Sequence, residues 1–421
     1  MMIFLGCYTD EVHPNGLKTL SLDEATGRME IVAEYPISNA LYQALSPDGK
    51  WLYTCTSEGL AVFDVSRRDA ETQRKENSDS SDMSANALNL KTRALASASE
   101  KSEFISLCLC HVAAMADGKR VVFADYLGGF AGSVVVEDGK FGEPIIHRHS
   151  GSGPNLPRQD KAHCHQALPL PDGSGYAVCD LGLDEIVEYP SGRIFKTTPA
   201  GAGPRHLLFH PNGRLAFLVS ELGNLITTLS WSPADGFKAL DSLSTLENPV
   251  NPVNPVLNTD SSRLAAAIRF TPDMKRIVVS NRGENSLVVF DFDEATGRLA
   301  FKARTLLSGD WPRDFIFVSP TLALVAMERS GEVHTLRFDA ASGGFSILST
   351  LSDLFRPVAL LGATGSDLIA TGTPEDPLRK VCQNGTTPML DSSVANVGQR
   401  ASASQAACRV GLAKRGFAIT S

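Results

Sequence analysis

Ionisable side chains stand at the ends of apolar segments at several places in this 421-residue sequence. His165 and Arg205 each come at the start of one apolar run, and Glu221 and Arg282 each follow another. A histidine with a near-neutral pKa can take up and return a proton. Arginine binds carboxylate or phosphate through charge-assisted, often bidentate hydrogen bonds. If the fold gathers these residues, they predict acid–base chemistry on a small anionic substrate.

The apolar runs between these residues follow one repeated pattern. Each copy has an apolar strand, a tight turn of the Pro-Asp-Gly type and a second apolar strand, as in the segments that start at Leu41 and His165. β-rich runs on either side of a turn made by Asp, Asn and Gly are typical of a β-hairpin. Six copies start at Leu41, Cys110, His165, Arg205, Ala266 and Arg313.

A second repeated element lies between the hairpins. The segments Asp23–Met29 and Asp293–Leu299 are nearly identical, and 232–237 and 339–345 are looser copies. One unit therefore holds about four strands, and four-stranded units every 40 to 60 residues or so are typical of propeller blades. The sequence predicts an all-β fold, a seven-bladed β-propeller of four-stranded antiparallel blades. We expect the N-terminal strand Ile3–Tyr8 to join C-terminal strands and close the seventh blade, which removes the open edge of the ring.

Antiparallel pairing places the start of the first strand of each hairpin beside the end of the second. If the first strand is the innermost of its blade, the polar residues at these ends form a ring around one mouth of the channel. Single polar residues at strand ends are usually solvated loop residues, but a whole set with several charged members favours a site. His206 and His210 are expected to be structural. The starts carry Tyr42, His111, His165, Arg205, His206, Arg313 and Asp314, and the ends carry Ser57, Asp125, Tyr126, Asp180, Ser220, Glu221, Asn281, Arg282, Glu328 and Arg329.

Two segments depart from the repeat. Residues 67–103 are polar and lack alternation, and residues 363–421 are rich in Ser, Ala, Thr and Gly. We therefore expect one propeller domain over residues 1–362, interrupted by a disordered insert at 67–103 and followed by a disordered tail at 363–421. The Asn-Pro-Val triplets at 248–256 suggest an extended surface loop.

Composition excludes several classes of function. The formal net charge is −8 and no basic stripe is visible, which argues against a nucleic-acid partner. No apolar run approaches 18 residues, so no membrane span is expected, and the apolar N-terminus is interpreted as a strand. The eight cysteines form no CxxC pair, which favours buried thiols in a reducing compartment, by default the cytoplasm. His163 and His165 could share a metal, but no third ligand follows at suitable spacing, so neither a metal nor another cofactor is expected.

At these positions the sequence resembles the seven-bladed β-propeller lactonases. That family contains 6-phosphogluconolactonases of the cycloisomerase-2 type and the 3-carboxy-cis,cis-muconate lactonizing enzyme. The resemblance covers about residues 3–66 and 104–361. It rests on Ser152-Gly153-Pro154-Asn155 with Arg158-Gln159, His163-Cys164-His165, Gly203-Pro204-Arg205-His206, Ser220-Glu221-Leu222, Ser280-Asn281-Arg282-Gly283 and Pro312-Arg313-Asp314-Phe315.

The resemblance implies roles for individual residues. The proposed catalytic histidine of the family falls on His165, its two arginines on Arg205 and Arg282, and its glutamate on Glu221. These four coincide with members of the ring derived above from the hairpins. The remaining expected contacts with substrate are His111, His163, Arg158, Asn281 and Arg313.

Three functions remain open at this point. The first is hydrolysis of an anionic sugar lactone such as 6-phosphogluconolactone, with His165 as the proton shuttle and Glu221 orienting His165 or an arginine. The second is cyclisation of a carboxy-cis,cis-muconate by the same residues. The third is a non-catalytic propeller that serves as an interaction platform, although the Gly-His and Trp-Asp signatures of such repeats are missing. A serine or cysteine nucleophile is disfavoured because no GxSxG motif is present.

Overall fold

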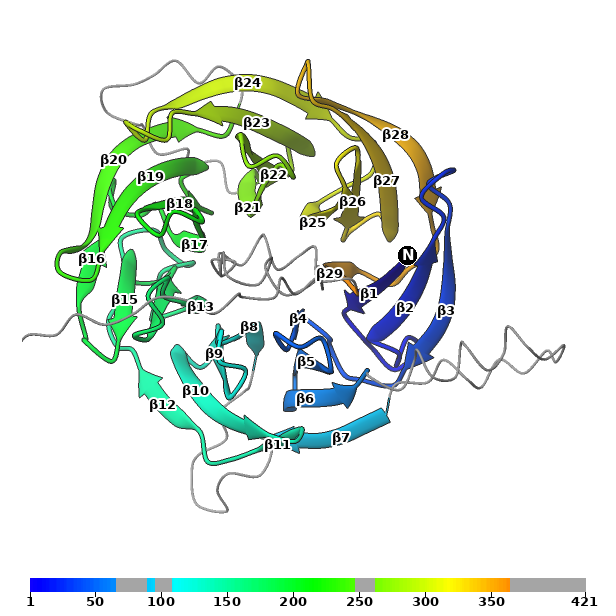
Figure 1. The fold of residues 1–421 in the computed structure, drawn as a ribbon, viewed down its shortest axis with the longest axis horizontal. Coiled ribbons are helices and arrows are strands. Elements are labelled where there is room, and N and C mark those ends of the chain that lie inside the picture. The colour runs from blue at the N-terminus through cyan, green and yellow to red at the C-terminus, as the bar shows by residue number, and fades with distance from the viewer. Residues whose placement is uncertain (66–88, 95–107, 247–261, 364–421) are drawn as a thin grey trace, which may run out of the picture. The chain divides into compact units, whose positions relative to one another are not determined.

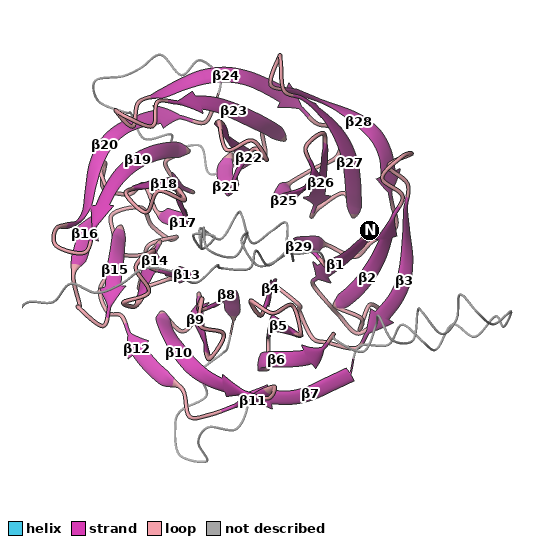
Figure 2. Ribbon diagram, in the orientation of Figure 1, coloured by secondary structure: helices cyan, strands magenta, loops and turns pink. Residues whose placement is uncertain are grey.

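The computed structural model describes residues 1–65, 89–94, 108–246 and 262–363, all within one compact unit. These residues form strands, turns and loops, and no helix occurs among them (Figure 2). The strands assemble into seven antiparallel sheets, which are arranged radially around a common axis (Figure 1). The innermost strands contact one another in succession around the ring. The expected all-β, seven-bladed propeller of four-stranded antiparallel blades is therefore confirmed.

Each sheet is one blade, and we number the blades 1 to 7 around the ring and give the strands of each from the axis outward. Blade 1 contains β29 (Pro357–Gly362), β1 (Met2–Cys7), β2 (Leu17–Leu22) and β3 (Met29–Tyr35), and blade 2 contains β4 (Tyr42–Leu45), β5 (Trp51–Thr56), β6 (Gly59–Asp64) and β7 (Asn89–Ala94). Blade 3 contains β8 (Leu109–Ala114), β9 (Arg120–Asp125), β10 (Phe130–Glu137), β11 (Lys140–Phe141) and β12 (Ile145–Arg148), and blade 4 contains β13 (Cys164–Pro169), β14 (Tyr176–Asp180), β15 (Glu185–Tyr189) and β16 (Ile194–Lys196). Blade 5 contains β17 (Pro204–Phe209), β18 (Leu215–Ser220), β19 (Leu225–Ser232) and β20 (Gly236–Ser244), blade 6 contains β21 (Leu264–Phe270), β22 (Arg276–Arg282), β23 (Ser286–Phe292) and β24 (Leu299–Leu306), and blade 7 contains β25 (Pro312–Ser319), β26 (Leu322–Met327), β27 (Glu332–Asp339) and β28 (Gly344–Leu351).

Blade 3 departs slightly from the four-strand rule. Its outermost position is shared by β11 and β12, which pair with different parts of β10. The other six blades have four strands each.

The repeated turns join the two innermost strands of a blade. Four of these turns have a glycine with positive φ at the same place, Gly49, Gly118, Gly173 and Gly213. A residue in the left-handed region carries little cost only when it is glycine. In blade 6 the equivalent position is Met274, with φ of 58°, so the turn keeps its shape although the glycine is missing.

The ring closes through the two ends of the described chain. β1 pairs antiparallel with β29, with Phe4 opposite Leu361 and Leu5 opposite Leu360. The expected closure by the N-terminal strand is therefore observed. It combines three N-terminal strands with a single C-terminal strand, and that C-terminal strand is the innermost of blade 1.

The hydrophobic core lies between neighbouring blades. Leu168 and Ile186 of blade 4, for example, pack with Leu207 and Phe209 of blade 5. Each blade thus buries its faces against two neighbours and places its innermost strand at the axis.

One prediction about the polar insert was wrong. Residues 89–94, inside the segment 67–103, form β7, the outermost strand of blade 2. Backbone pairing with β6 forms this strand, and such pairing needs no apolar alternation in the sequence. The rest of that segment, the triplets at 248–256 and residues 364–421 lie outside the described residues.

Two further features bear on the expectations from composition. Within the described ranges, no helix is long and apolar enough to cross a membrane. The six cysteines of these ranges are free thiols, and all but Cys108 are buried.

Candidate active site

A β-bulge near the start of the innermost strand is a common feature of six blades, and in blade 6 it lies between Ala265 and Ile268. The register shifts between Cys164 and Gln166 and again between Pro204 and His206, which leaves His165 and Arg205 as the extra residues. Bulges re-aim a side chain and are frequent next to active sites. The extra residues of blades 3, 4, 5, 7 and 1 are Cys110, His165, Arg205, Arg313 and Val358.

These five extra residues line a single cavity between the innermost strands. Leu41, Tyr42, His206 and Asp314 complete its lining. The residues come from six different blades, so positions far apart in the sequence meet there. The cavity thus brings together six members of the ring expected from the hairpins, Tyr42, His165, Arg205, His206, Arg313 and Asp314.

A buried carboxylate lies beside this cavity. Glu221, which directly follows β18, accepts a hydrogen bond of 2.6 Å from Arg158 Nη2 at Oε1. Its Oε2 lies 3.0 Å from Arg205 Nε and 2.8 Å from Arg282 Nη2. Burial alone would raise the pKa of Glu221, but the three guanidinium groups, Arg282 first, hold this pKa well below its ordinary value. Glu221 is therefore ionised and organises three arginines.

The arginines carry more charge than Glu221 neutralises. Arg205 also donates to the carbonyl of Ala266 at 2.6 Å, and Arg282 to the carbonyl of Ala265 at 2.8 Å. Burial, followed by repulsion from Arg282, lowers the pKa of Arg205 to about 9, so this group stays cationic at neutral pH. Three arginines on one carboxylate leave a surplus of positive charge, which favours an anion or a developing negative charge.

His165 is one of the two histidines, with His206, that line the cavity. Its Nε2 lies 4.0 Å from Glu221 Oε2, and its buried Nδ1 has no hydrogen-bond partner in the described part of the chain. Burial, and next the positive charge of Arg205, lowers the pKa of His165 well below its ordinary value. The imidazole is thus neutral at physiological pH and able to accept a proton.

Local backbone contacts position Glu221 against β17. The N–H of Glu221 donates to the carbonyl of Gly203 at 2.7 Å. Gly203 has φ of +66°, and its own N–H donates to Asp184 Oδ1 at 2.8 Å. The Gly-Pro-Arg segment therefore ties the start of the innermost strand to the residue that follows the second strand.

Three other expected residues make contacts that hold the fold around the site. His163 has Nδ1 2.9 Å from the carbonyl of Tyr126 and Nε2 2.9 Å from Asp160 Oδ1. Asn281 is fully buried, and its side chain bonds to Thr245 and Ser286. These bonds occupy the polar atoms of both side chains. His111 packs against Tyr42 with ring centroids 4.2 Å apart and lies outside the cavity lining; burial, then the charge of Arg269, lowers its pKa to about 3.

Arg158 and Arg313 occupy different places. Arg158 donates to the hydroxyl of Tyr126 at 3.0 Å as well as to Glu221, so it belongs to the carboxylate cluster. Arg313 lines the cavity and donates to Glu328 at 3.0 Å. The sequence alignment did not single out Cys110 or Val358, although both occupy the bulge position that also holds His165.

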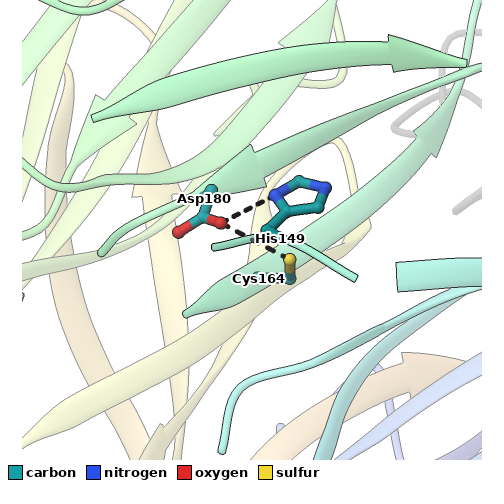
Figure 3. A group of neighbouring side chains, drawn as sticks. All are labelled: His149, Cys164 and Asp180. Atoms are coloured by element: carbon teal, nitrogen blue, oxygen red, sulfur yellow. Dashed lines mark hydrogen bonds and ion pairs between the residues drawn. The ribbon is translucent and has the colours of Figure 1, made fainter. Parts of the chain in front are cut away.

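One group of potential metal ligands occurs among the described residues, between blades 3 and 4. Its members are His149, Cys164 and Asp180, whose ligand atoms lie within 4.8 Å of one another (Figure 3). His149 Nδ1 is 2.7 Å from Asp180 Oδ2, and its Nε2 is 3.0 Å from the hydroxyl of Tyr189. Asp180 Oδ1 accepts three backbone N–H groups, those of His163, Gly182 and Leu183. Protein partners thus explain this arrangement as a link between the blades.

Comparison with known proteins agrees with this geometry. The family model described as "Lactonase, 7-bladed beta-propeller" matches residues 2–360. The chain belongs to this family. It is 32% identical over 261 residues to the 6-phosphogluconolactonase of Bacillus subtilis, across 60% of this chain and 72% of that protein. The family resemblance noted in the sequence is therefore confirmed.

Solved structures of the lactonase fold superpose over nearly their whole length. A protein from Lactobacillus plantarum has a TM-score of 0.69 at 26% identity, covering 85% of this chain and 98% of its own. A putative 6-phosphogluconolactonase from Bacteroides fragilis has a TM-score of 0.68 at 23% identity, covering 86% and 97%. The second likeness supports the fold alone.

Proposed function

We propose that this lactonase-family protein hydrolyses an anionic sugar lactone of the 6-phosphogluconolactone type at one mouth of the central channel, against the residues that line the small cavity. The observation that carries the proposal is the placement of His165, Arg205 and Arg313 on equivalent bulges that line one cavity, with the Glu221 cluster beside it. A reducing compartment such as the cytoplasm is part of the proposal, since the described cysteines are unpaired. The related 6-phosphogluconolactonase of Bacillus subtilis supports this substrate class.

In the proposed reaction His165 acts as general base and then as general acid. Neutral His165 takes a proton from water while the water oxygen forms a bond to the lactone carbonyl carbon. Arg205 faces the same cavity and stabilises the negative charge that develops on the carbonyl oxygen. The ring C–O bond then breaks, and the proton on His165 passes to the leaving alkoxide. The product is an open-chain hydroxy acid, which releases a proton to solvent at neutral pH.

Glu221 has a positioning role in this proposal. Its two oxygens accept from three arginines, whereas His165 Nε2 lies 4.0 Å from Glu221 Oε2, beyond hydrogen-bond distance. We therefore assign Glu221 to orienting Arg205 and Arg282 rather than to orienting the histidine.

The test compares two substrates and two variants. Wild-type protein should release acid from 6-phosphogluconolactone faster than the spontaneous hydrolysis measured without protein. His165→Asn should lower kcat by about 10²- to 10⁴-fold, because it removes the proton shuttle. The matched control is His147→Asn, a histidine on β12 outside the cavity lining, which should keep full turnover.

Two outcomes would overturn this proposal. One is turnover of 3-carboxy-cis,cis-muconate, followed by its ultraviolet absorbance, without turnover of the lactone. The other is full lactonase activity in a normally folded His165→Asn variant, which would point to another site or to a non-catalytic role.

A further inference from the structure

We propose that Arg313 and Arg356, held on Glu328 and Tyr8, form a second anion-binding subsite that takes the charged substituent of the lactone. This inference rests on the proposed function, because it concerns the same cavity. It places the catalytic arginines and the arginines that select the substrate in different blades.

The first argument is a repeated ion pair. Arg205 and Glu221 of blade 5 have counterparts in Arg313 and Glu328 of blade 7. In both blades the arginine is the extra residue of the bulge, and the glutamate directly follows the second strand. The nitrogen–oxygen distance is 3.0 Å in each pair. The propeller therefore places the same arginine–glutamate ion pair in two blades, and the arginines of both pairs line one cavity.

The two ion pairs differ in the exposure of their arginines and in the number of partners that the arginines have. Arg205 and Arg282 have side chains only 4% and 5% exposed, and Glu221 is engaged by three guanidinium groups. Arg313 and Arg356 are 20% and 49% exposed. Of the Arg313 nitrogens, Nη1 alone bonds to a side chain within the ranges that the structure describes. The remaining N–H groups are available to a phosphate or carboxylate.

Tyr8 holds the two guanidinium groups of this subsite. Its ring centroid lies 5.6 Å from the Arg313 guanidinium carbon and 4.1 Å from that of Arg356. The Tyr8 N–H also donates to the carbonyl of Arg356 at 3.1 Å. Contact with an aromatic ring restrains the arginine planes and leaves their N–H edges free for bidentate binding.

The charge of the subsite also favours an anion. Glu328 is buried, and burial alone would raise its pKa, but Arg313 and then Arg356 hold this pKa below its ordinary value. One ionised carboxylate against two arginines leaves one positive charge without a partner among these residues. Arg313 lines the same cavity as His165, so an anion held there is attached to a lactone within reach of the base.

The experiment compares a charged and a neutral lactone. Arg313→Gln and Arg356→Gln should each raise KM for 6-phosphogluconolactone on the order of 10- to 100-fold, the loss expected for hydrogen bonds to a charged group. Their KM for glucono-δ-lactone, which lacks the phosphate, should change much less. The matched control is Arg28→Gln, which breaks an exposed ion pair with Glu30 in blade 1. It should leave KM for both lactones unchanged.

Two results would overturn the subsite. One is an equal loss on both lactones in folded variants, which would assign the arginines to catalysis or to stability. The other is no effect on either lactone. If the wild-type protein turns over neither lactone, the proposed function fails and the subsite is judged by calorimetry with inorganic phosphate. Binding by the wild type that Arg356→Gln weakens would then support the subsite, and unchanged or absent binding would reject it.

Discussion

His165 combines two properties that a proton shuttle needs. Its bulge position aims the imidazole into a cavity, and its Nδ1 has no partner in the described part of the chain. Burial, and next the positive charge of Arg205, keep the imidazole neutral, while Arg205 and Arg282 bond to Glu221. Electrostatic interactions are strong in such a buried site, so the same arginines can stabilise an oxyanion without large rearrangement.

The state of His165 predicts the pH dependence of the reaction. A lowered pKa means that the imidazole stays unprotonated, and therefore active as a base, as the pH falls through 6.5. We expect kcat/KM to remain level from about pH 8 to below pH 6.5 and to decline only in more acidic solution. The measurement is a profile corrected for spontaneous hydrolysis. His165→Asn should give a low profile without this acidic decline, and a wild-type decline centred at or above pH 6.5 would contradict the assignment.

The sequence predicted this cluster because charged tips recur at fixed places in the repeat. The sequence could not distinguish strand-end side chains that belong to the cluster at the cavity from strand-end side chains that bond within or between blades. Asn281 and Arg282 are adjacent in sequence, yet Asn281 bonds to Thr245 and Ser286 while Arg282 bonds to Glu221. Which side chain finds an internal partner depends on the neighbouring blade, and the repeat does not reveal it.

At the scale of the elements, the hairpin is the unit that carries both stability and function. Its turn end needs only tight backbone geometry, and the two strands predicted around each turn are present. The bulge at the other end was not predicted, because the innermost strands are buried on both faces and have no apolar alternation that an extra residue would interrupt. β7 was not predicted because an outer strand can form by backbone pairing alone, without an apolar pattern in its sequence.

Gly203 tests whether the bulged end of the hairpin positions the site. Its φ of +66° disfavours any side chain, and a Cβ atom there would lie 2.8 Å from Leu222 Cγ. Gly203→Ala should cost roughly 1–3 kcal/mol of unfolding free energy. It should also lower kcat, because the Gly203 carbonyl binds the N–H of Glu221.

The control for this variant lies at the opposite end of the same hairpin. Gly213 has nearly the same φ of +67°, but its Cβ would meet only Pro171, at 3.4 Å. Gly213→Ala should therefore lose about 1 kcal/mol of stability and keep its kcat. Denaturation midpoints and steady-state kinetics on both variants check this expectation, and equal losses of kcat would show that the bulged end has no special role.

At the scale of the molecule, ring closure connects the two ends of the described chain to the cavity. The junction of β1 and β29 places Tyr8 against Arg356 and brings Val358 into the cavity lining. Closure of the seventh blade was predicted from the sequence, but the role of Tyr8 and Arg356 was not. These residues lie 348 positions apart and belong to no copy of the hairpin repeat.

Leu5 tests how far the closing blade supports the whole ring. This residue is fully buried on β1, opposite Leu360 of β29, and it packs in one cluster with Ile316 and Leu324 of blade 7. Leu5→Ala should lower the free energy of unfolding by about 2–5 kcal/mol through lost burial and the cavity that remains.

Because every blade packs against two neighbours, weakening the closing blade should lower the stability of all seven together. Far-UV circular dichroism and the fluorescence of Trp51, Trp231 and Trp311, in and beside blades 2, 5 and 7, should then report the same shifted denaturation midpoint. Val12→Ala, at a side chain that is 78% exposed, provides the control and should leave the midpoint in place. An early transition seen by only one of the two probes would show that blade 1 unfolds alone. The cavity would then depend on a locally opening blade rather than on a cooperative ring, since Val358 would leave its lining before the other blades unfold.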